Sequence, residues 1–377
     1  MLNWVEIDAE AIRSNLRQFA ERVGPSVALG AVVKSNAYGH GMLEVASLAE
    51  EGGADWLCIN SIEEAIRLRE GGHGGRILVM GYVPLDGLAP VVEHDLHPVV
   101  SNRETLVRLN ELAGRHGRRV PVHLKVETGT HRQGIPESDL PGLATLVRNS
   151  AGLRLEGLCT HFADIEDTTD HTYAQSQIET FDRIAGTLRE AGFDVPIRHA
   201  ACSAAALLFT RTHLDLARIG ISLYGLWPSK ETYVSCLDLG KSALELRPVL
   251  TWKTRIAQIR TVPEGSYIGY GRSFRTTRES RIAVLPVGYH EGYDRRLSGV
   301  AHVLVHGRRA PIRGRICMNM CMIDVSDIAE ARLEDEVVLL GSQGEERISA
   351  EQVAAWSGTI SYEIVSRIHP SLPRVLT

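Results

Sequence analysis

A lysine that directly follows a short apolar run is the first residue of this chain that is placed to do chemistry. The run ends with Val32 and Val33, Lys34 comes next, and Gly39 and Gly41 follow closely. A β-branched apolar run that is halted by Asn and Gly predicts a buried strand leading into a loop. Burial there would lower the pKa of the lysine, and the neutral amine is the form that makes a Schiff base with a carbonyl group. The alternative is a lysine that ends the strand and reaches water through its long stem.

The stretch KVETGTHRQG, residues 125–134, carries the next two basic candidates. Lys125 ends a predicted strand, and Arg132 lies in the loop that follows it. A planar guanidinium suits a bidentate contact with a carboxylate, which an amino-acid substrate would present. An arginine that is simply solvated in its loop is the alternative.

Three more polar residues come at the ends of apolar runs: His161, Ser203 and Arg218. His161 has no second histidine or carboxylate at metal-ligand spacing, so we predict no metal, and a histidine of the core is the alternative. Ser203 could cap a helix. Arg218 carries a guanidinium that stays protonated and can therefore only donate hydrogen bonds.

An alternation of strand-like and helix-like segments must position these residues. The strand-like runs are 27–34, 54–60, 76–82, 97–101, 120–128, 154–162, 197–203 and 215–224. The helix-like segments are 9–23, 41–52, 61–71, 85–94, 102–117, 137–149 and 171–191, with a short, weakly helical interval at 204–211. Eight such repeats predict an α/β fold, a TIM-like parallel (β/α)₈ barrel. A doubly wound sheet is the alternative, but its glycine-rich phosphate motif is missing after the first strand.

A barrel fold also predicts where the active site lies, because active sites of such barrels form at the carboxyl ends of the strands. Those ends carry Lys34, Asn60, Lys125, His161, Ser203 and Arg218. The loops after the seventh and eighth strands of such barrels often bind phosphate through backbone N–H groups and a hydroxyl.

The pattern changes after Pro228 into long alternating strands, at about 246–262, 281–288, 300–316, 320–325 and 335–341, with helical signals at 349–356 and 361–368. This pattern predicts a mostly antiparallel β domain. We place the boundary near residue 235, which gives a barrel domain at 9–235 and a C-terminal β domain at 236–377. The strand predicted at residues 1–8 lies outside the barrel.

Composition argues against several classes of protein. The chain has 377 residues, 44% hydrophobic and 23% charged, with a net charge of −5. These values give no sign of a nucleic-acid or membrane-surface partner. The beginning of the chain has no basic and apolar signal pattern, and its six cysteines form no CxxC pair, so we expect a cytoplasmic protein with reduced thiols.

The segment AVVKSNAYGHG, residues 31–41, resembles the pyridoxal-phosphate-binding segment of the bacterial alanine racemases, which are fold-type III amino-acid racemases. The resemblance implies pyridoxal 5'-phosphate as cofactor, bound covalently by Lys34, with Tyr38 hydrogen-bonded to its phosphate. It also assigns phosphate binding to Ser203, Gly220 and Ile221. In the family, the first strand joins the second domain.

Other motifs extend the resemblance through the barrel. The family reads KVDTGMGR where this chain has KVETGTHR, and it implies that Arg132 meets the substrate carboxylate with support from a carbamylated Lys125. The family's THF motif implies that His161 joins a hydrogen-bond relay with an arginine and a tyrosine. Arg218 corresponds to the arginine at the pyridine nitrogen. Since it can only donate, that nitrogen would stay unprotonated, the cofactor would be a weaker electron sink, and side reactions would be suppressed.

The C-terminal domain resembles the family too. SYIGYGRSF, residues 266–274, implies Tyr270 as the second catalytic base, opposite Lys34 and supplied by the partner subunit of a homodimer. Tyr289 would line the substrate corridor, and Met318 would approach the substrate carboxylate. The chain departs from the family pattern at His290, Glu291, Asn319 and Pro370. An amide at Asn319, where the family usually has aspartate, could accommodate a hydroxyl-bearing substrate.

The resemblance therefore predicts an isomerase that interconverts L- and D-alanine for the cell-wall peptidoglycan. A serine or broad-specificity racemase is the first alternative. A decarboxylase on the same barrel would normally have an acidic residue in place of Arg218. A non-catalytic pyridoxal-phosphate-binding protein would lack Tyr270 and the β domain, and a Schiff-base aldolase would use Lys34 without cofactor.

Overall fold

The structure is a computed structural model that describes residues 1–241 and 244–377, which form two compact units. The barrel unit contains Glu10–Ser35 and Met42–Arg247. The β unit contains Met1–Ala9, Asn36–Gly41 and Pro248–Thr377. The boundary expected near residue 235 falls within helix α10 (Lys230–Asp238), which belongs to the barrel unit.

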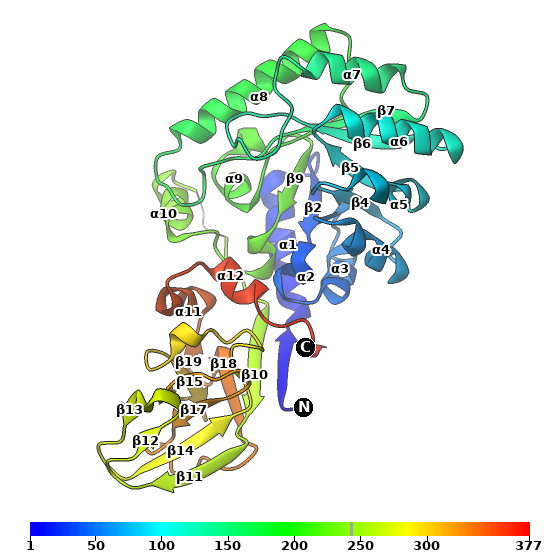
Figure 1. Ribbon diagram of the computed structural model, residues 1–377. Helices are drawn as coiled ribbons and strands as arrows, with labels where there is room; N and C mark the ends of the chain where they lie inside the picture. Colours follow the sequence, from blue (N-terminus) through cyan, green and yellow to red (C-terminus); the bar gives the residue numbers. More distant parts are fainter. Residues whose placement is uncertain (242–243) are drawn as a thin grey trace. The chain divides into compact units, whose positions relative to one another are not determined.

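Eight parallel strands form the centre of the barrel unit, in the order β8-β7-β6-β5-β4-β3-β2-β9 (Figure 1). They are β2 (Ala28–Val32), β3 (Trp56–Ile59), β4 (Arg76–Val79), β5 (His97–Val100), β6 (Val120–Lys125), β7 (Leu153–Cys159), β8 (Ile197–His199) and β9 (Leu216–Ile219). Backbone hydrogen bonds from Asp215 to Arg198 and from Arg218 to Ala201 bring β9 beside β8 and nearly close the ring. The predicted TIM-like barrel is confirmed, and each strand-like run overlaps one of these strands.

Helices follow the strands, with α1 (Ala9–Val23) before the first of them. The others are α3 (Met42–Glu51), α4 (Ile62–Glu70), α5 (Ala89–Glu93), α6 (Arg103–Arg115), α7 (Leu140–Asn149), α8 (Thr172–Glu190), α9 (Ser203–Leu208) and α10. The buried stripe of α1 includes Asn15, whose amide donates to the carbonyls of Leu223 and Arg247 and so ties the helix to the end of the unit. Within residues 1–241 and 244–377, no helix is long and apolar enough to cross a membrane.

The β unit is mostly antiparallel, as predicted, and is made of three sheets. The largest has the order β16-β15-β18-β10-β1-β20, with β19 beside β18; the others are β11-β14-β17 and β12-β13. The strands are β1 (Asn3–Ile7), β10 (Leu250–Arg255), β11 (Gln258–Val262), β12 (Tyr267–Ile268), β13 (Phe274–Arg275), β14 (Ser280–Leu285), β15 (His302–Val305), β16 (Arg308–Pro311), β17 (Cys321–Asp324), β18 (Glu336–Gln343), β19 (Glu346–Ile348) and β20 (Arg374–Leu376). The N-terminal strand β1 pairs with β10 and β20, and two helices, α11 (Ala350–Ser357) and α12 (Ser361–Ser366), complete the unit.

The segment after β2 was expected to be a loop. It is instead a left-handed helical turn. In α2 (Lys34–Tyr38), the φ angles of Ser35, Asn36, Ala37 and Tyr38 lie between 52° and 54°. A left-handed turn costs L-residues about 1–2 kcal/mol each, so local preference opposes this conformation.

Tertiary contacts hold this turn in place. The Ser35 N–H donates to Glu64 Oε1 at 2.5 Å, and the carbonyl of Gly39 accepts from the guanidinium of Arg374 at 2.7 and 3.1 Å. A Cβ at Gly39 would lie 2.0 Å from the carbonyl oxygen of Val365, so only glycine fits there. Strain of this kind persists only where the surrounding structure imposes it, and it is typical of functional sites.

We expect Ser35→Gly to raise the free energy of unfolding by up to about 1 kcal/mol. Glycine would relieve about 1–2 kcal/mol of left-handed strain and lose about 0.4–1 kcal/mol through the more flexible unfolded chain. The matched control is Ser47→Gly, at an exposed position of the right-handed helix α3. This control should lower the free energy of unfolding by about 0.5 kcal/mol. Urea unfolding of both variants measures the change in the free energy of unfolding, which should be positive for Ser35→Gly and negative for Ser47→Gly. An equal loss of stability in both variants would contradict a strained turn.

Candidate active site

Lys34 lies where β2 ends and α2 begins, at the carboxyl end of the barrel strands. Burial lowers the pKa of its amine, and the positive charges of Arg132 and Arg218 lower it further, against the opposing effect of Glu64. A larger fraction of neutral amine at a given pH is the condition for nucleophilic lysine chemistry. The barrel therefore supplies the environment that was predicted for this lysine.

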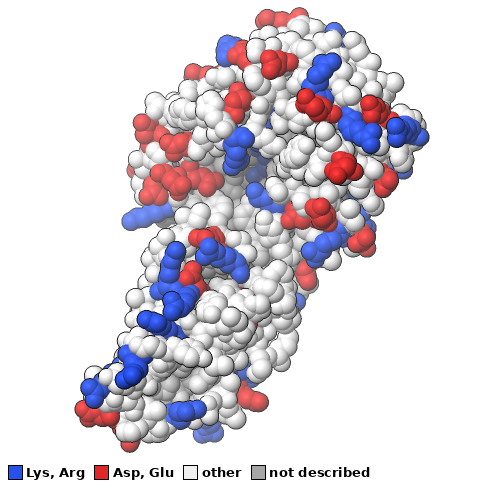
Figure 2. Space-filling view, in the orientation of Figure 1, with Lys and Arg blue, Asp and Glu red and all other residues white. Residues whose placement is uncertain are grey.

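Five predicted site residues of the barrel unit lie close enough to act on one another electrostatically: Lys34, Lys125, Arg132, His161 and Arg218. Burial, followed by the charges of the four basic residues, lowers the pKa of His161 to about 3. Burial, helped by Arg132 and Arg218, also lowers the pKa of Lys125. On the face drawn in Figure 2, basic and acidic side chains are interspersed over the barrel unit. Such a cluster suits anionic groups such as phosphate and carboxylate.

The loop that carries Arg132 is attached to the barrel by side-chain hydrogen bonds. The hydroxyl of Thr130 donates to the carbonyl of His161 at 2.7 Å, and the hydroxyls of Thr128 and Thr160 lie 2.7 Å apart. The carboxylate of Glu127 accepts the Gly129 N–H at 2.6 Å, so the departure from aspartate leaves this turn closed. The loop is thus built to hold a basic side chain at the end of β6.

The loops after β8 and β9 meet at Ser203. Its buried hydroxyl accepts the backbone N–H groups of Gly220 at 3.0 Å and Ser222 at 3.4 Å. The hydroxyl of Ser222 is fully buried and has no hydrogen-bond partner in the described part of the chain. An orphaned hydroxyl beside backbone N–H donors, with Ile221 at the first position of η3 (Ile221–Tyr224), is an arrangement that could bind an anion.

Arg218 is buried, and its hydrogen bonds differ from those expected. Its Nη1 donates to Nδ1 of His199, and its Nη2 donates to the carbonyls of Thr160 and Ala200 at 3.0 and 3.1 Å. Among the described residues, none of its hydrogen bonds goes to His161, which it influences only through its charge. His199 is a functional candidate that the motif analysis missed, although a histidine inside a predicted buried strand is a signal in itself.

The other predicted site residues belong to the β unit. Tyr38 ends α2, and its ring lies 6.0 Å from that of Tyr362. Tyr270 opens a short 3₁₀ turn between β12 and β13, and its side chain is 74% exposed in the single chain. Its neighbour Gly271 leaves room for Arg315, because a Cβ there would lie 2.8 Å from that guanidinium. The hydroxyl of Tyr270 is thus presented on the surface of its own unit.

Two loops of the β unit, residues 287–293 and 316–320, are joined by hydrogen bonds. The backbone N–H groups of Tyr289 and His290 donate to the carbonyls of Cys317 and Met318 at 3.1 and 2.9 Å. The amide of Asn319 donates to Glu291 Oε1 at 2.7 Å. The loops thus bring together Tyr289, Met318 and Asn319. An aspartate at 319 would face the carboxylate of Glu291, whereas the amide of Asn319 donates to it.

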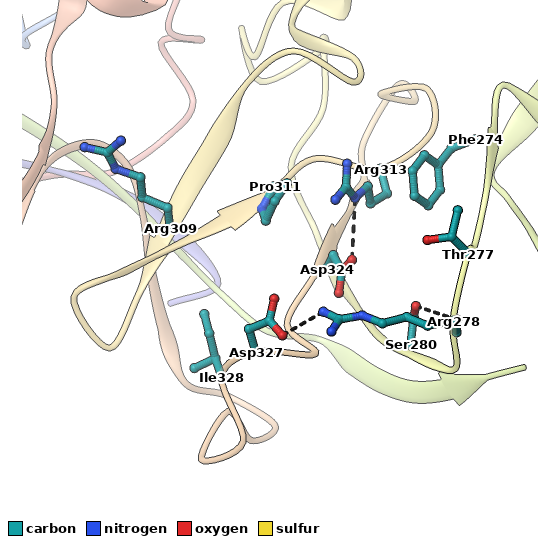
Figure 3. A pocket seen from close by; sticks show the side chains of 10 residues that line it. All are labelled: Phe274, Thr277, Arg278, Ser280, Arg309, Pro311, Arg313, Asp324, Asp327 and Ile328. Carbon is teal, nitrogen blue, oxygen red and sulfur yellow. Dashed lines mark hydrogen bonds and ion pairs between the residues drawn. The ribbon is translucent and has the colours of Figure 1, made fainter. Parts of the chain in front are cut away.

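A separate hollow in the β unit contains none of the predicted site residues (Figure 3). It is lined by Phe274, Thr277, Arg278, Ser280, Arg309, Pro311, Arg313, Asp324, Asp327 and Ile328. Arg278 pairs with Asp327 at 2.6 Å, and Arg313 lies 3.5 Å from Asp324, as the dashed lines of Figure 3 show. These arginines already have carboxylate partners, so the hollow is a weaker candidate than the barrel cluster.

Comparison with known proteins places both units in one family. Residues 7–228 match the model "Alanine racemase, N-terminal domain", and residues 249–376 match "Alanine racemase, C-terminal domain". The chain is 42% identical to the alanine racemase of Halothermothrix orenii over 371 residues, 98% of this chain and 96% of that protein. It is 39% identical to the alanine racemase of Methanococcus maripaludis, over 99% of this chain and 98% of that protein.

Solved structures agree. The alanine racemase of Bacillus anthracis with bound L-Ala-P has a TM-score of 0.92 at 36% identity, covering 100% of this chain and 95% of that one. The alanine racemase of Clostridium difficile 630 has a TM-score of 0.94 at 31% identity, covering 100% and 96%. On this sequence and structural similarity, together with the barrel-mouth lysine, the chain belongs to the alanine racemase family and is an isomerase of the racemase class.

Proposed function

We propose that this chain interconverts L- and D-alanine with pyridoxal 5'-phosphate, using Lys34 and Tyr270 as two bases on opposite faces of the substrate. The observation that carries the proposal is the amine of Lys34, whose pKa is lowered at the carboxyl end of the barrel by burial and by nearby arginines. The related proteins are named alanine racemases. The absence of disulfides among the six cysteines supports a reducing, cytoplasmic location.

The residues of the barrel mouth fit the proposed cofactor. The orphaned hydroxyl of Ser222, beside Ser203, Gly220 and Ile221, suits its phosphate. The phosphate contact of Tyr38 remains an expectation from the family resemblance. When bound to an amino acid, pyridoxal phosphate withdraws electrons and makes the hydrogen on the α-carbon acidic. Arg218 is a donor only, so it would keep the ring nitrogen unprotonated and limit this withdrawal to what proton exchange needs.

Substrate binding would use the basic residues beside Lys34. Arg132 can make a bidentate contact with the α-carboxylate, with Lys125 close enough to act on it. The lowered pKa of Lys125 provides the neutral amine that carbamylation requires, which would turn this lysine into an anionic partner for Arg132. His161, with a pKa of about 3, is neutral at physiological pH and can position neighbours without carrying a charge.

Inversion at the α-carbon requires that a proton leave one face and a proton arrive at the other. Nζ of Lys34 would exchange the proton on one face, and Oη of Tyr270 would exchange it on the other, so the substrate need not turn over. The exposure of Tyr270 in the single chain supports a homodimer in which this hydroxyl completes the partner's site.

Residues that could affect the substrate range differ between this chain and the family pattern. One hydrogen of the Asn319 amide is used by Glu291, which leaves the second to donate to a hydroxyl-bearing substrate. Met318 and Tyr289 lie on the same pair of loops. Serine is therefore the second substrate to test, beside alanine.

Lys34→Ala should abolish covalent capture of pyridoxal phosphate and lower kcat by at least about 10³-fold, because it removes both the attachment point and one base. Borohydride reduction followed by peptide mass analysis measures capture, and a racemisation assay measures kcat. Because the pKa of Lys34 is lowered, capture by the wild type should begin at a lower pH than capture by a surface lysine such as Lys230. Lys230→Ala is the control and should behave as wild type. Turnover by Lys34→Ala would overturn the assignment.

Mixing two inactive variants tests the shared site. Lys34→Ala and Tyr270→Phe chains, refolded or co-expressed together, should regain about a quarter of wild-type activity, since about half of the dimers are hybrids with one intact site. Tyr267→Phe, on the same hairpin, is the control and should remain active by itself. Recovery no greater than that of either variant alone would place Tyr270 outside the partner's site.

Asn319→Asp should raise the alanine-to-serine ratio of kcat/KM by about two- to tenfold, the effect of losing one hydrogen-bond donor. The matched variant Asn319→Asp/Glu291→Gln removes the repulsion between carboxylates, so that a shift common to both variants reports on the substrate. A ratio equal to that of the wild type in both variants would show that substrate range is decided elsewhere.

A further inference from the structure

A chain of buried polar side chains runs through the barrel, one from each of five consecutive strands: His97 of β5, His123 of β6, Glu156 of β7, His199 of β8 and Arg218 of β9. Nδ1 of His199 accepts from Arg218, and its Nε2 lies 2.9 Å from Nδ1 of His123. Nε2 of His123 lies 3.2 Å from Oε2 of Glu156, which His97 also contacts. Of these five residues, the family resemblance assigned a role only to Arg218, which lies at one end of the series of hydrogen bonds.

These five polar side chains cross the barrel interior and are closely packed. The ring of Trp56, from β3, lies 5.6 Å from that of His123, although β4 and β5 separate their strands along the barrel wall. A Cβ at Gly157 would lie 2.0 Å from Nδ1 of His123, so the residue after Glu156 must be glycine. Close packing of this kind leaves the remaining side chains little room to rearrange when one member is removed.

The direction of every hydrogen bond in this chain follows from its two ends. Arg218 always donates, so Nδ1 of His199 must carry a lone pair, and the proton of this neutral imidazole sits on Nε2. That proton is donated to Nδ1 of His123, whose own proton then sits on Nε2 and is donated to Glu156. An ionised carboxylate only accepts, so both ends require the same direction.

Protonation preferences agree with this arrangement. Burial, together with the charge of Arg218, holds the pKa of His199 well below its usual value. Burial also lowers the pKa of His123, although its bond to Glu156 acts in the opposite sense. Burial would raise the pKa of Glu156, but the hydrogen bonds from His123 and His97 outweigh it and lower the pKa overall. The neutral histidines thus connect a buried cation to a buried anion.

The same direction argues against a metal ion at His97, His123 and Glu156, whose ligand atoms lie within 4.8 Å of one another. A metal would need the lone pair of Nε2 of His123, which moves its proton to Nδ1. His199 would then have to turn its own proton to Nδ1, against the N–H of Arg218. The relay and a metal therefore exclude each other.

We propose that Glu156 is a positioning residue that stabilises the Nε2–H tautomer of His123, which accepts from His199, and thereby helps to hold the guanidinium of Arg218 in the orientation its site requires. The importance of that orientation for turnover rests on the function proposed for Arg218. Arg218 has no carboxylate among its hydrogen-bond partners in the described part of the chain, so the relay is its route to a compensating charge.

The test compares Glu156→Gln, which keeps an acceptor oxygen, with Glu156→Leu, which has none. Long-range ¹⁵N spectra of histidine-labelled full-length protein report each tautomer, with signals assigned through His123→Gln and His199→Gln. In the wild type and in Glu156→Gln, both histidines should be neutral with the proton on Nε2, with or without pyridoxal phosphate. In Glu156→Leu, the tautomer of His123 should become mixed.

Turnover gives the second readout. Glu156→Leu should lower kcat by about 10–100-fold, the range for lost partners that orient a functional histidine, with KM nearly unchanged, and Glu156→Gln should restore most of kcat. Arg154→Leu removes the other ion pair of Glu156, at 3.3 Å, and should change neither readout. An Nδ1–H tautomer or a charged imidazole at His123 or His199 in the wild type would overturn the proposal even if Glu156→Leu fails to fold. So would unchanged tautomers in Glu156→Leu. A wild type that shows the predicted tautomers and does not racemise alanine would refute the proposed function instead.

Discussion

A guanidinium that cannot lose its proton, buried at the end of β9, constrains the polar interior of the barrel. Arg218 forces a lone pair onto His199, contributes to lowering the pKa values of Lys34, Lys125 and His161, and gives its remaining hydrogen bonds to two backbone carbonyls. Burial is the larger cause of these lowered pKa values, and the fixed charge of Arg218 adds to it. Together, burial and this charge favour the neutral amine of Lys34, while no carboxylate of the described residues is a hydrogen-bond partner of Arg218.

The site is assembled against local preference. Four successive L-residues of α2 adopt left-handed angles, and several cationic groups share the mouth of one barrel. Each feature lowers the stability of the empty chain, and each would be relieved or used when an anionic ligand arrives. Strain and charge of this kind are typical of sites that trade folding stability for function.

The β unit contributes a different kind of control. Its two joined loops hold Asn319 against Glu291. The family pattern has aspartate at both positions, so Asn319 replaces a carboxylate by an amide and Glu291 is longer by one methylene. The amide joins the two loops by a hydrogen bond and adds a hydrogen-bond donor near the proposed substrate corridor. The exposed Tyr270 on a neighbouring hairpin suggests that the single chain is an incomplete form of the proposed enzyme.

The sequence by itself determined the barrel, since the β/α alternation located all eight strands. Their expected carboxyl ends brought together Lys34, Lys125, His161 and Arg218 before any contact was known. It missed helix α10 and the short strands β12, β13, β19 and β20, because short segments carry too little periodicity. Only the tertiary structure decided the hand of α2 and the partner of Arg218. Left-handed angles are imposed by contacts with Glu64 and Arg374, which are distant in sequence. The choice of His199 over His161 depends on the register between strands, and neither signal is present in local sequence.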